Sequence, residues 1–440
     1  MSPIIIKGIQ LLLSLSLLVV LHELGHFIPA KLFKTRVEKF YLFFDVKFAL
    51  FKKKIGGTEY GIGWLPLGGY VKISGMIDES MDTEQMKLPP EPWEFRSKPA
   101  WQRLIIMLGG VIVNLLLGLL IYAMIFYVWG KDTLTYDAVP NGMEVSKLAK
   151  SIGFEDGDRI IEVDGVVLDD VLDINRNLFL RSVEEVSIQR ANGLKEVISV
   201  PEDFGSQMFE SGDLFPFSVL IILPEIIIQP DSPAEAAGLM NGDVVLKTNG
   251  IPINGYSFLV THLKEQKYDT LQIELRRGAD QIITKKILPR EDGTIGISSA
   301  DKSVQYTHVD LTFSESIYDG FNYGFWTLHD YAAQFKYVFT KKGASQVGGF
   351  AAIGNLFPAE WNWRGFWSST ALISIILAFM NILPIPALDG GHVMFLMYEI
   401  ISGRKPNDRF MEYAQMFGFL LLLAVLLFAN GNDIYRAIFG

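Results

Sequence analysis

Two histidines and a glutamate stand close together near the start of the chain, in the run "LHELGH" (Leu21–His26). Residues four apart share one face of a helix, so the imidazoles of His22 and His26 can reach the same metal ion. Glu23 lies alongside, where its carboxylate can take a proton from water at that ion. A zinc ion lowers the pKa of a bound water from about 16 to about 7, so this spacing favours hydrolysis at neutral pH.

A third metal ligand is expected elsewhere, because a catalytic zinc usually has three protein ligands and one open position. The best candidate is Asp389, the only acid in "MNILPIPALDGGHV" (Met380–Val393). His392 is a rival three residues later, although we favour its interpretation as a helix cap or surface residue. With two histidines, one carboxylate and no cysteine available, zinc is the expected cofactor. The remaining histidines are interpreted as surface or packing residues: His262, His308 and His329.

The histidine motif ends a long apolar run, so the elements that must position it are membrane spans. Half of the residues in the chain are hydrophobic. Crossing a bilayer takes about 20 apolar residues, and four segments are long enough: roughly 4–29, 104–128, 366–385 and 411–430. We interpret the first as a retained span, because no small-residue cleavage site follows it. The sequence therefore predicts a polytopic α-helical membrane protein with four transmembrane helices.

The distribution of lysine and arginine predicts the orientation of these spans. Cations gather after the first span, within 31–54, and between the third and fourth, within 404–409. Both loops are therefore predicted to be cytoplasmic, with both termini and the segment 130–365 outside. The first and third spans then run in the same direction, so the two histidines can meet Asp389 at one depth. Pro29 is expected to end the first helix just beyond the second histidine.

The long outer segment contains an internal repeat. The stretch "GFEDGDRIIEVDG" (Gly153–Gly165) recurs as "GLMNGDVVLKTNG" (Gly238–Gly250), and each copy leads from a Gly-Asp turn into an alternating apolar strand. Two small α+β modules, at about 132–215 and 219–300, are the natural interpretation. The pattern resembles the PDZ domains of bacterial membrane proteases, and β-rich modules of another type are the alternative. Aromatic residues over 311–340 predict an amphipathic helix that packs on the modules or lies at the membrane surface.

Two further segments fall on the predicted cytoplasmic side. The stretch "GTEYGIGWLPLGGYVKISGM" (Gly57–Met76) alternates residues that favour strands and contains a Gly-Gly pair. It predicts a β-hairpin or small sheet that dips back toward the bilayer. The polar, proline-rich stretch 81–101 is interpreted as a linker.

Three features together closely resemble the bacterial site-2 proteases, which are intramembrane zinc metalloproteases of the M50 type. They are "HELGH" in the first span, "NILPIPALDGG" in the third, and the PDZ-like pair inserted between the second and third. The resemblance extends over nearly the whole chain. It implies intramembrane proteolysis, with zinc held by His22, His26 and Asp389 and with Glu23 as the base. The substrates it implies are single-span membrane proteins, such as a pre-cleaved anti-sigma factor or remnant signal peptides, which the PDZ-like pair would filter.

The resemblance also implies how the chain is divided. Residues 1–130 would hold transmembrane helices 1 and 2 with the histidine motif and the β-loop. The two PDZ-like domains would occupy 131–217 and 218–303, followed by the amphipathic helix and a linker over 304–365. Residues 366–440 would hold transmembrane helices 3 and 4. The expected protein is a monomer in the bacterial cytoplasmic (inner) membrane, with its active site toward the cytoplasm and its PDZ-like domains outside.

Substrate contacts are expected at two places. The first is a set of positions that match residues near the active site or along the substrate path in the family: Asn114, Asn381, Pro384 and Pro386. The second follows from the need of a helical substrate to unwind before it is cleaved, which frees backbone groups that have no water to bind. An exposed strand edge in the β-loop could bind them, through Gly68, Gly69, Tyr70 and Val71. Asn381 could do the same, and a packing contact between spans is an equal alternative for it.

The sequence departs from the family pattern in two places. Gly110-Val111 stands where Gly-Pro is usual, and the run Gly348–Phe350 stands where Gly-Pro-Ile is usual. The formal net charge of −10 argues against nucleic acid as a partner. A non-catalytic membrane adaptor that binds extracytoplasmic peptides is the alternative function, but it would need neither Glu23 nor a complete set of metal ligands.

Overall fold

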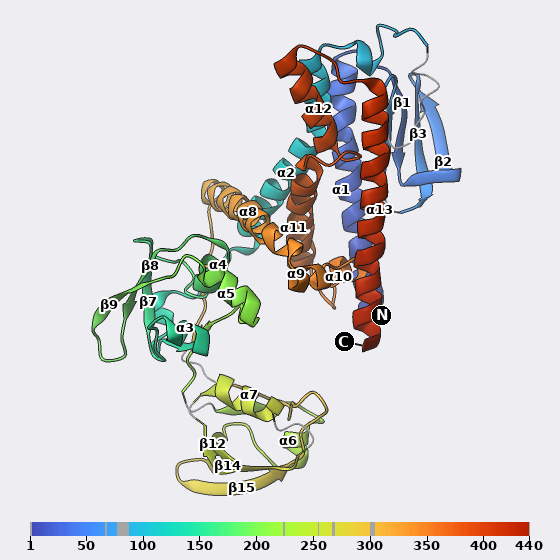
Figure 1. The fold of residues 1–440 in the computed structure, drawn as a ribbon. Coiled ribbons are helices and arrows are strands. Elements are labelled where there is room, and N and C mark those ends of the chain that lie inside the picture. The colour runs from blue at the N-terminus through green and yellow to red at the C-terminus, as the bar shows by residue number, and fades with distance from the viewer. Residues whose placement is uncertain are drawn as a thin grey trace. The chain divides into compact units, whose positions relative to one another are not determined.

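The computed structural model describes residues 2–66, 68–76, 88–222, 225–253, 255–265, 269–299 and 304–439. The chain forms two compact units (Figure 1). One consists of Met1–Gly130 together with Asp310–Gly440, and the other of Lys131–Val309. The second unit is therefore an insertion between two halves of the first. At its two ends, β5 (Lys131–Thr133) and β17 (Thr307–Val309) pair as antiparallel strands.

Within the described part of the chain, four helices of the first unit are long and apolar enough to cross a membrane. They are α1 (Pro3–Leu32), α2 (Ala100–Trp129), α11 (Trp363–Ile382) and α13 (Asp408–Phe439). Each contains or largely overlaps one of the predicted spans. The chain is therefore a polytopic α-helical membrane protein.

Two predicted helix ends need correction, and both involve proline. The prediction that Pro29 ends the first helix is wrong, because α1 continues for another turn. Pro29 lacks the amide that would bond to the Gly25 carbonyl, but Ala30 is fully buried and its packing holds the last turn in place. The third span ends earlier than predicted, at the end of α11, because Pro384 and Pro386 follow and cannot continue its hydrogen-bond ladder.

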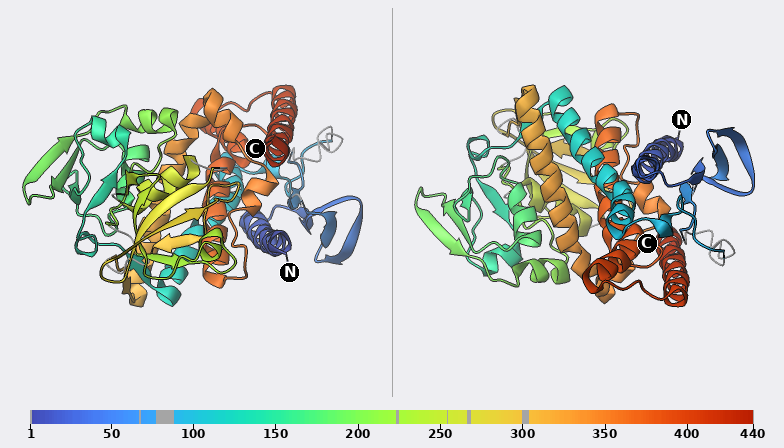
Figure 2. Two further views of the ribbon diagram at one scale, coloured as in Figure 1. Left: turned by 90° about the horizontal axis from the view of Figure 1, so that it is seen from below. Right: turned by 90° about the horizontal axis from the view of Figure 1, so that it is seen from above.

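The central helix of this unit is α2, which packs against α1, α11, α12 (Asp389–Ser402) and α8 (Phe313–Phe335) (Figure 2). The predicted amphipathic helix corresponds to α8, which starts with a capping box at Thr312. A Cβ added to Gly320 would lie 2.4 Å from the Cα of Ala123, so glycine lets the backbones of α8 and α2 touch. The structure therefore places α8 against α2 and α11, and this packing was not predicted; the predicted placement at the membrane surface stays a prediction. Shorter helices connect α8 to α11: η4 (Lys336–Phe339), α9 (Lys341–Gln346) and α10 (Phe350–Gly354).

A four-stranded sheet lies beside the end of α1 that carries the histidines (Figure 1). Its strands are β1 (Val37–Leu42), β2 (Phe44–Ile55), β3 (Thr58–Leu65) and β4 (Tyr70–Ile73), in the order β2-β3-β1-β4. Only β1 and β3 are parallel. The predicted hairpin over 57–76 is thus part of a larger sheet that includes the lysine-rich segment before it. As an edge strand, β4 pairs with β1 on one side and leaves its other side free of strands in the described sheet.

The inserted unit contains two stretches with a similar, though not identical, succession of elements. The first consists of η3 (Tyr136–Ala138), β6 (Met143–Val145), α3 (Lys147–Ser151), β7 (Arg159–Val163), α4 (Asp173–Leu180), β8 (Glu185–Gln189), β9 (Lys195–Ser199), α5 (Phe204–Ser211) and β10 (Phe217–Val219). The second consists of β11 (Ile226–Ile228), α6 (Pro233–Ala236), β12 (Val244–Thr248), β13 (Ile251–Pro252), α7 (Tyr256–Glu265), β14 (Leu271–Arg277), β15 (Gln281–Ile287) and β16 (Ile297–Ser299). In each, the strand after the Gly-Asp turn pairs with the strand after the helix.

The sequence repeat is matched by repeated contacts. In the first stretch the Arg190 guanidinium donates to the buried Asp158 carboxylate at 2.8 Å and to the Gly153 carbonyl at 3.0 Å. In the second, Arg277 donates to Asp243 at 2.8 Å and to the Gly238 carbonyl at 3.0 Å. Burial opposes the charge on Asp243, but hydrogen bonds from Arg277 and from a backbone amide hold the pKa of this carboxyl below its usual value. Each Gly-Asp turn is thus closed by an arginine at the end of the strand that follows the helix: Arg277 is the last residue of β14, and Arg190 directly follows β8.

Candidate metal centre

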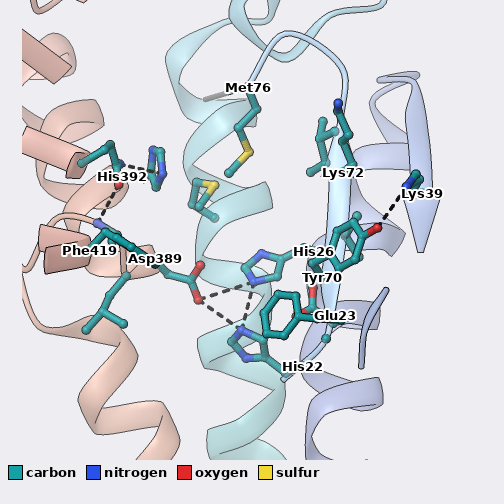
Figure 3. Close-up of a pocket in the computed structure, with 18 of the residues that line it drawn as sticks. His22, Glu23, His26, Lys39, Tyr70, Lys72, Met76, Asp389, His392 and Phe419 are labelled. Atoms are coloured by element: carbon teal, nitrogen blue, oxygen red, sulfur yellow. Dashed lines mark hydrogen bonds and ion pairs between the residues drawn. The ribbon is translucent and has the colours of Figure 1, made fainter. Parts of the chain in front are cut away.

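His22, His26 and Asp389 come together at one point (Figure 3). The two histidines lie one turn apart on α1, and Asp389 is the first residue of α12. Oδ2 of Asp389 lies 3.4 Å from Nε2 of each histidine, and the two Nε2 atoms are 3.3 Å apart. In the described part of the chain, this is the group of three whose ligand atoms lie near enough to hold a metal ion.

The three atoms fit a tetrahedral zinc ion. Zinc–nitrogen and zinc–oxygen bonds are roughly 2.0–2.2 Å, which separates two ligand atoms of a tetrahedron by about 3.3–3.6 Å. All three edges of the observed triangle fall in this range. Oδ2 of Asp389 is buried and accepts no hydrogen bond from the residues that the structure describes. A buried carboxylate oxygen that no hydrogen-bond donor satisfies is costly unless a cation binds it.

A close crossing of α1 and α2 lies directly behind the histidines. A Cβ added to Gly109 would lie 1.9 Å from the Gly25 carbonyl oxygen, so the two backbones touch. The next residue, Gly110, faces the imidazoles: its Cβ would lie 2.4 Å from Nε2 of His26 and 2.6 Å from Cε1 of His22. Only glycine leaves room for both rings here. Sequence reasoning missed this role, because Gly110 carries no chemical group and its partners lie some 85 residues away in the chain.

The outer nitrogen of each imidazole also has a partner. Nδ1 of His26 lies 2.8 Å from the Ile106 carbonyl oxygen, which only an N–H can satisfy. Nε2 of His26 is then the unprotonated nitrogen and faces the cluster. Nδ1 of His22 lies 3.1 Å from the side-chain amide of Asn114, which is almost completely buried. This contact fixes the orientation of the His22 ring, whose Nε2 faces Oδ2 of Asp389.

Asn114 itself is held by α11. Its backbone carbonyl accepts a 2.6 Å hydrogen bond from the Ser374 hydroxyl. The side chain therefore supports His22 from behind. It does not line the cavity in front of the cluster.

The loop that delivers Asp389 is fixed by α13. Ala387, just before it, has a φ of +77°, a conformation that residues other than glycine rarely adopt. Its amide donates a 2.6 Å hydrogen bond to Oε1 of Gln415. Nε2 of Gln415 lies 2.9 Å from Nε2 of His392, so the same side chain binds both ends of the turn. His392 thus pairs with Gln415 and is not a member of the metal-ligand triangle.

A cavity of about 380 Å³ opens in front of the cluster. Glu23 lines it beside the two histidines and Asp389, and the facing wall is β4 (Figure 3). A Cβ on Gly69 would lie 3.6 Å from Cγ of Glu23, so the start of this edge strand runs past the glutamate. Tyr70 donates a 2.8 Å hydrogen bond to Asp45. Burial and this hydrogen bond both raise the pKa of Tyr70, which keeps its phenol neutral.

The residues predicted to contact substrate fall into two groups. Gly69, Tyr70 and Val71 line the cavity, and Gly68 directly precedes them. The other predicted positions are not among the lining residues: Asn114, Asn381, Pro384 and Pro386. The end of the same loop lines the wall in their place, from Ala387 to Asp389. The remaining histidines are not members of the cluster and have other partners: His262 stacks on Phe258, His308 pairs with Asp132, and His329 contacts Trp326.

Comparisons with known proteins agree over the length of the chain. The family model described as Peptidase family M50 matches residues 10–425. The Regulator of sigma E protease of Haemophilus influenzae is 28% identical, over 97% of this chain and 98% of its own. Protease RseP of Yersinia pestis is 25% identical, over 97% of both chains. A Neisseria meningitidis protein whose name includes "zinc metalloprotease" is 27% identical, over 96% of this chain and 97% of its own.

Proposed function

Because the chain belongs to peptidase family M50, we propose that it hydrolyses peptide bonds within or next to the membrane-spanning segment of single-span membrane proteins. It is a zinc metalloendopeptidase of a membrane. The observation that carries the finer proposal is the position of the ligand triangle. Two of its members belong to a helix that spans the membrane, and the third follows the end of another. A metal site carried by such helices can reach a substrate peptide bond that lies within the bilayer.

In this proposal His22, His26 and Asp389 hold the zinc ion. When bound, zinc polarises a carbonyl group and makes water acidic enough to lose a proton near neutral pH. Glu23 is the general base, because its carboxylate lines the cavity beside the two histidines. Asn114 and the Ile106 carbonyl hold the two imidazoles with Nε2 toward the metal.

The substrate would bind as an extended strand along β4. A helical segment hides its peptide bonds in internal hydrogen bonds, so it has to unwind before it can be cleaved. The free edge of β4 offers backbone donors and acceptors on the cavity wall opposite the metal ligands. Strand addition there would both stabilise the unwound segment and bring one of its peptide bonds to Glu23. Gly69, Tyr70 and Val71 are the residues that support this role. Asn381, Pro384 and Pro386 do not line the cavity, and their contacts with substrate stay a prediction.

The proposal also covers the orientation of the chain in the membrane, the two repeated modules and the substrates. The lysine-rich β-loop and the α12–α13 loop would face the cytoplasm of a bacterial inner membrane. The two repeated modules, from 131–217 and 218–303, would be PDZ-like domains outside it, where they filter substrates by size. Substrates would be single-span proteins such as a pre-cleaved anti-sigma factor or remnant signal peptides, and the protease would act as a monomer. A non-catalytic adaptor is disfavoured, because it needs no triangle of metal ligands.

The test is cleavage of a co-expressed single-span membrane protein by the Glu23→Gln variant. We expect this variant to keep its zinc and its folding and to lose cleavage, because only the base is removed. Glu412→Gln, the same change at an exposed position on α13, is the matched control and should cleave normally. Undiminished cleavage by Glu23→Gln would show that another group is the base, and cleavage by neither the wild type nor the control would refute the proposal.

A further inference from the structure

A second cavity, of about 390 Å³, adjoins the catalytic one. Met76, His392 and Gln415 line both, so the two spaces share a wall. The proposed metal ligands line only the first. The second is enclosed by the segment before α2, the start of α2, the outer part of α12, and the α12–α13 loop with the start of α13.

The lining of this second cavity combines apolar side chains with an excess of positive charge. Its apolar lining residues include Phe95, Leu396 and Met411. Three cations line it against one acid, Glu399: Arg96, Arg103 and Lys405. The cavity therefore favours a ligand with an apolar group and a negative charge.

The three cations are not equally available. Arg103 pairs with Glu399 at 2.5 Å, and both side chains are largely buried. Arg96 pairs with Glu94 at 2.6 Å. Lys405 is exposed and donates to the Arg96 carbonyl at 3.2 Å, and no ion pair to it is found in the described part of the chain. Lys405 is thus the charge that an incoming anion can meet.

The edge strand leads from one cavity to the other. Tyr70 and Ile73 line the catalytic cavity, and Gly75 and Met76 continue the chain into the wall of the second. A strand rises about 3.3 Å per residue. A peptide paired along β4 beside the metal ligands would therefore reach the second cavity about four to six residues further on.

We propose that the second cavity is a subsite for the substrate polypeptide, which binds an apolar residue and a neighbouring acidic residue about four to six positions from the cleaved bond. This inference rests on the proposed intramembrane protease function. Continuity with the catalytic cavity along β4 identifies the occupant as the same peptide. The apolar lining residues hold the apolar side chain, and Lys405 binds the carboxylate.

Cysteine crosslinking tests the path, and the chain contains no cysteine of its own. In the Glu23→Gln background, single cysteines replace Tyr70 in the catalytic cavity and Met411 in the second. The probe is a model single-span protein with one cysteine scanned through its span and flanks. Met416→Cys is the matched control, because Met416 lies on the same helix, is 43% exposed and lines neither cavity.

We expect Tyr70→Cys and Met411→Cys each to crosslink one short run of probe positions, with the two runs about four to six residues apart. Met416→Cys should crosslink neither run. Absence of crosslinks at Met411→Cys, or the same pattern at Met416→Cys, would overturn the proposal. This readout needs no cleavage, so it is independent of whether the proposed proteolysis occurs.

Charge exchange tests the chemistry of the subsite. Model substrates carry Asp, Asn or Lys at the position that crosslinks to Met411→Cys. We expect the wild type to cleave the Asp substrate roughly three- to fivefold faster than the Lys substrate, the effect of one exposed ion pair. Lys405→Glu should reverse this order, whereas Arg404→Glu, at a neighbouring cation that does not line the cavity, should keep it.

Cleavage of the Asn substrate should be the same in all three proteins. An unchanged order in Lys405→Glu would overturn the proposal, as would an equal effect of Arg404→Glu, which would indicate general surface charge. A third outcome would also overturn the proposal: Met411→Cys gives no crosslinks, and anionic phospholipid raises the activity of the wild type but not that of Lys405→Glu. The cavity would then bind a lipid headgroup. Failure of the wild type to cleave any of the three substrates, with the crosslinks intact, would contradict the protease function alone.

Discussion

Replacing Gly110 by alanine should disable the metal centre without adding any polar or charged group. The new Cβ would lie 2.4 Å from Nε2 of His26 and 2.6 Å from Cε1 of His22. Ordinary carbon–nitrogen contacts are about 3.5 Å, so relief of each contact requires a shift of about 1 Å. Neither ring can move away freely, because Ile106 and Asn114 hold their outer nitrogens.

A shift of this size is large for a catalytic site, where a displacement of about 1 Å can reduce the rate roughly a hundredfold. Loss of ligand orientation typically weakens metal binding by about 10- to 100-fold. We therefore expect Gly110→Ala to bind zinc at least tenfold more weakly and to cleave a model substrate at least a hundredfold more slowly. Competition with a zinc chelator and a substrate cleavage assay measure the two effects on the same purified protein.

Two other glycines separate this effect from general disruption of the helices. Gly8 lies in α1 with nothing within 4 Å of its added Cβ, so Gly8→Ala should be neutral. Gly118 lies in α2 against Ile375, so Gly118→Ala should reduce thermal stability through packing while zinc affinity stays normal. Normal zinc affinity and activity in Gly110→Ala would refute the view that α2 shapes the metal site by close approach.

Three further predictions concern other contacts. Asn114→Leu should weaken zinc binding about 10- to 100-fold in the chelator assay while the helical circular dichroism stays unchanged, because His22 loses its support. Folding lowers the pKa of Asp243, so its pairing with Arg277 stabilises the second module fully at pH values above the unfolded pKa, which is near 4. This stabilisation is lost as the pH falls through the pKa of the folded state. Arg277→Ala should therefore lower the melting temperature at pH 7 more than at pH 3, and an equal decrease would contradict the assignment. Asp433 accepts hydrogen bonds from the backbone amides of Gly349, Ala351 and Ala352, so Asp433→Ala should cost about 1–3 kcal/mol in denaturant unfolding, and no change would show that α13 is held elsewhere.

Sequence patterns predicted the parts of this protein that depend on local signals. Hydropathy located the four spans, and helical spacing brought His22 and His26 to one face. Asp389 could be singled out because it is the only acid in an apolar segment, and the structure places its carboxylate beside both histidines. The internal repeat likewise indicated two similar modules.

The features that the sequence did not predict depend on contacts between distant segments. Gly110 matters only because α2 crosses α1 at the histidines, and Gln415 only because α13 lies over the loop that carries Asp389. The strands β1 and β2 were missed because their lysines resemble those of a solvated cytoplasmic loop. Pro29 stays inside its helix because tertiary packing compensates for the lost hydrogen bond.

The most direct test of the account is the zinc content and coordination of the purified protein. We expect one zinc ion per chain, and X-ray absorption should show nitrogen and oxygen ligands at about 2.0–2.2 Å with no sulfur. Asp389→Ala and His26→Ala should each lose this zinc, whereas Glu23→Gln should retain it and His392→Ala should retain it as well. Wild-type zinc content in Asp389→Ala, or its loss in His392→Ala, would contradict the claim that His22, His26 and Asp389 form the metal site.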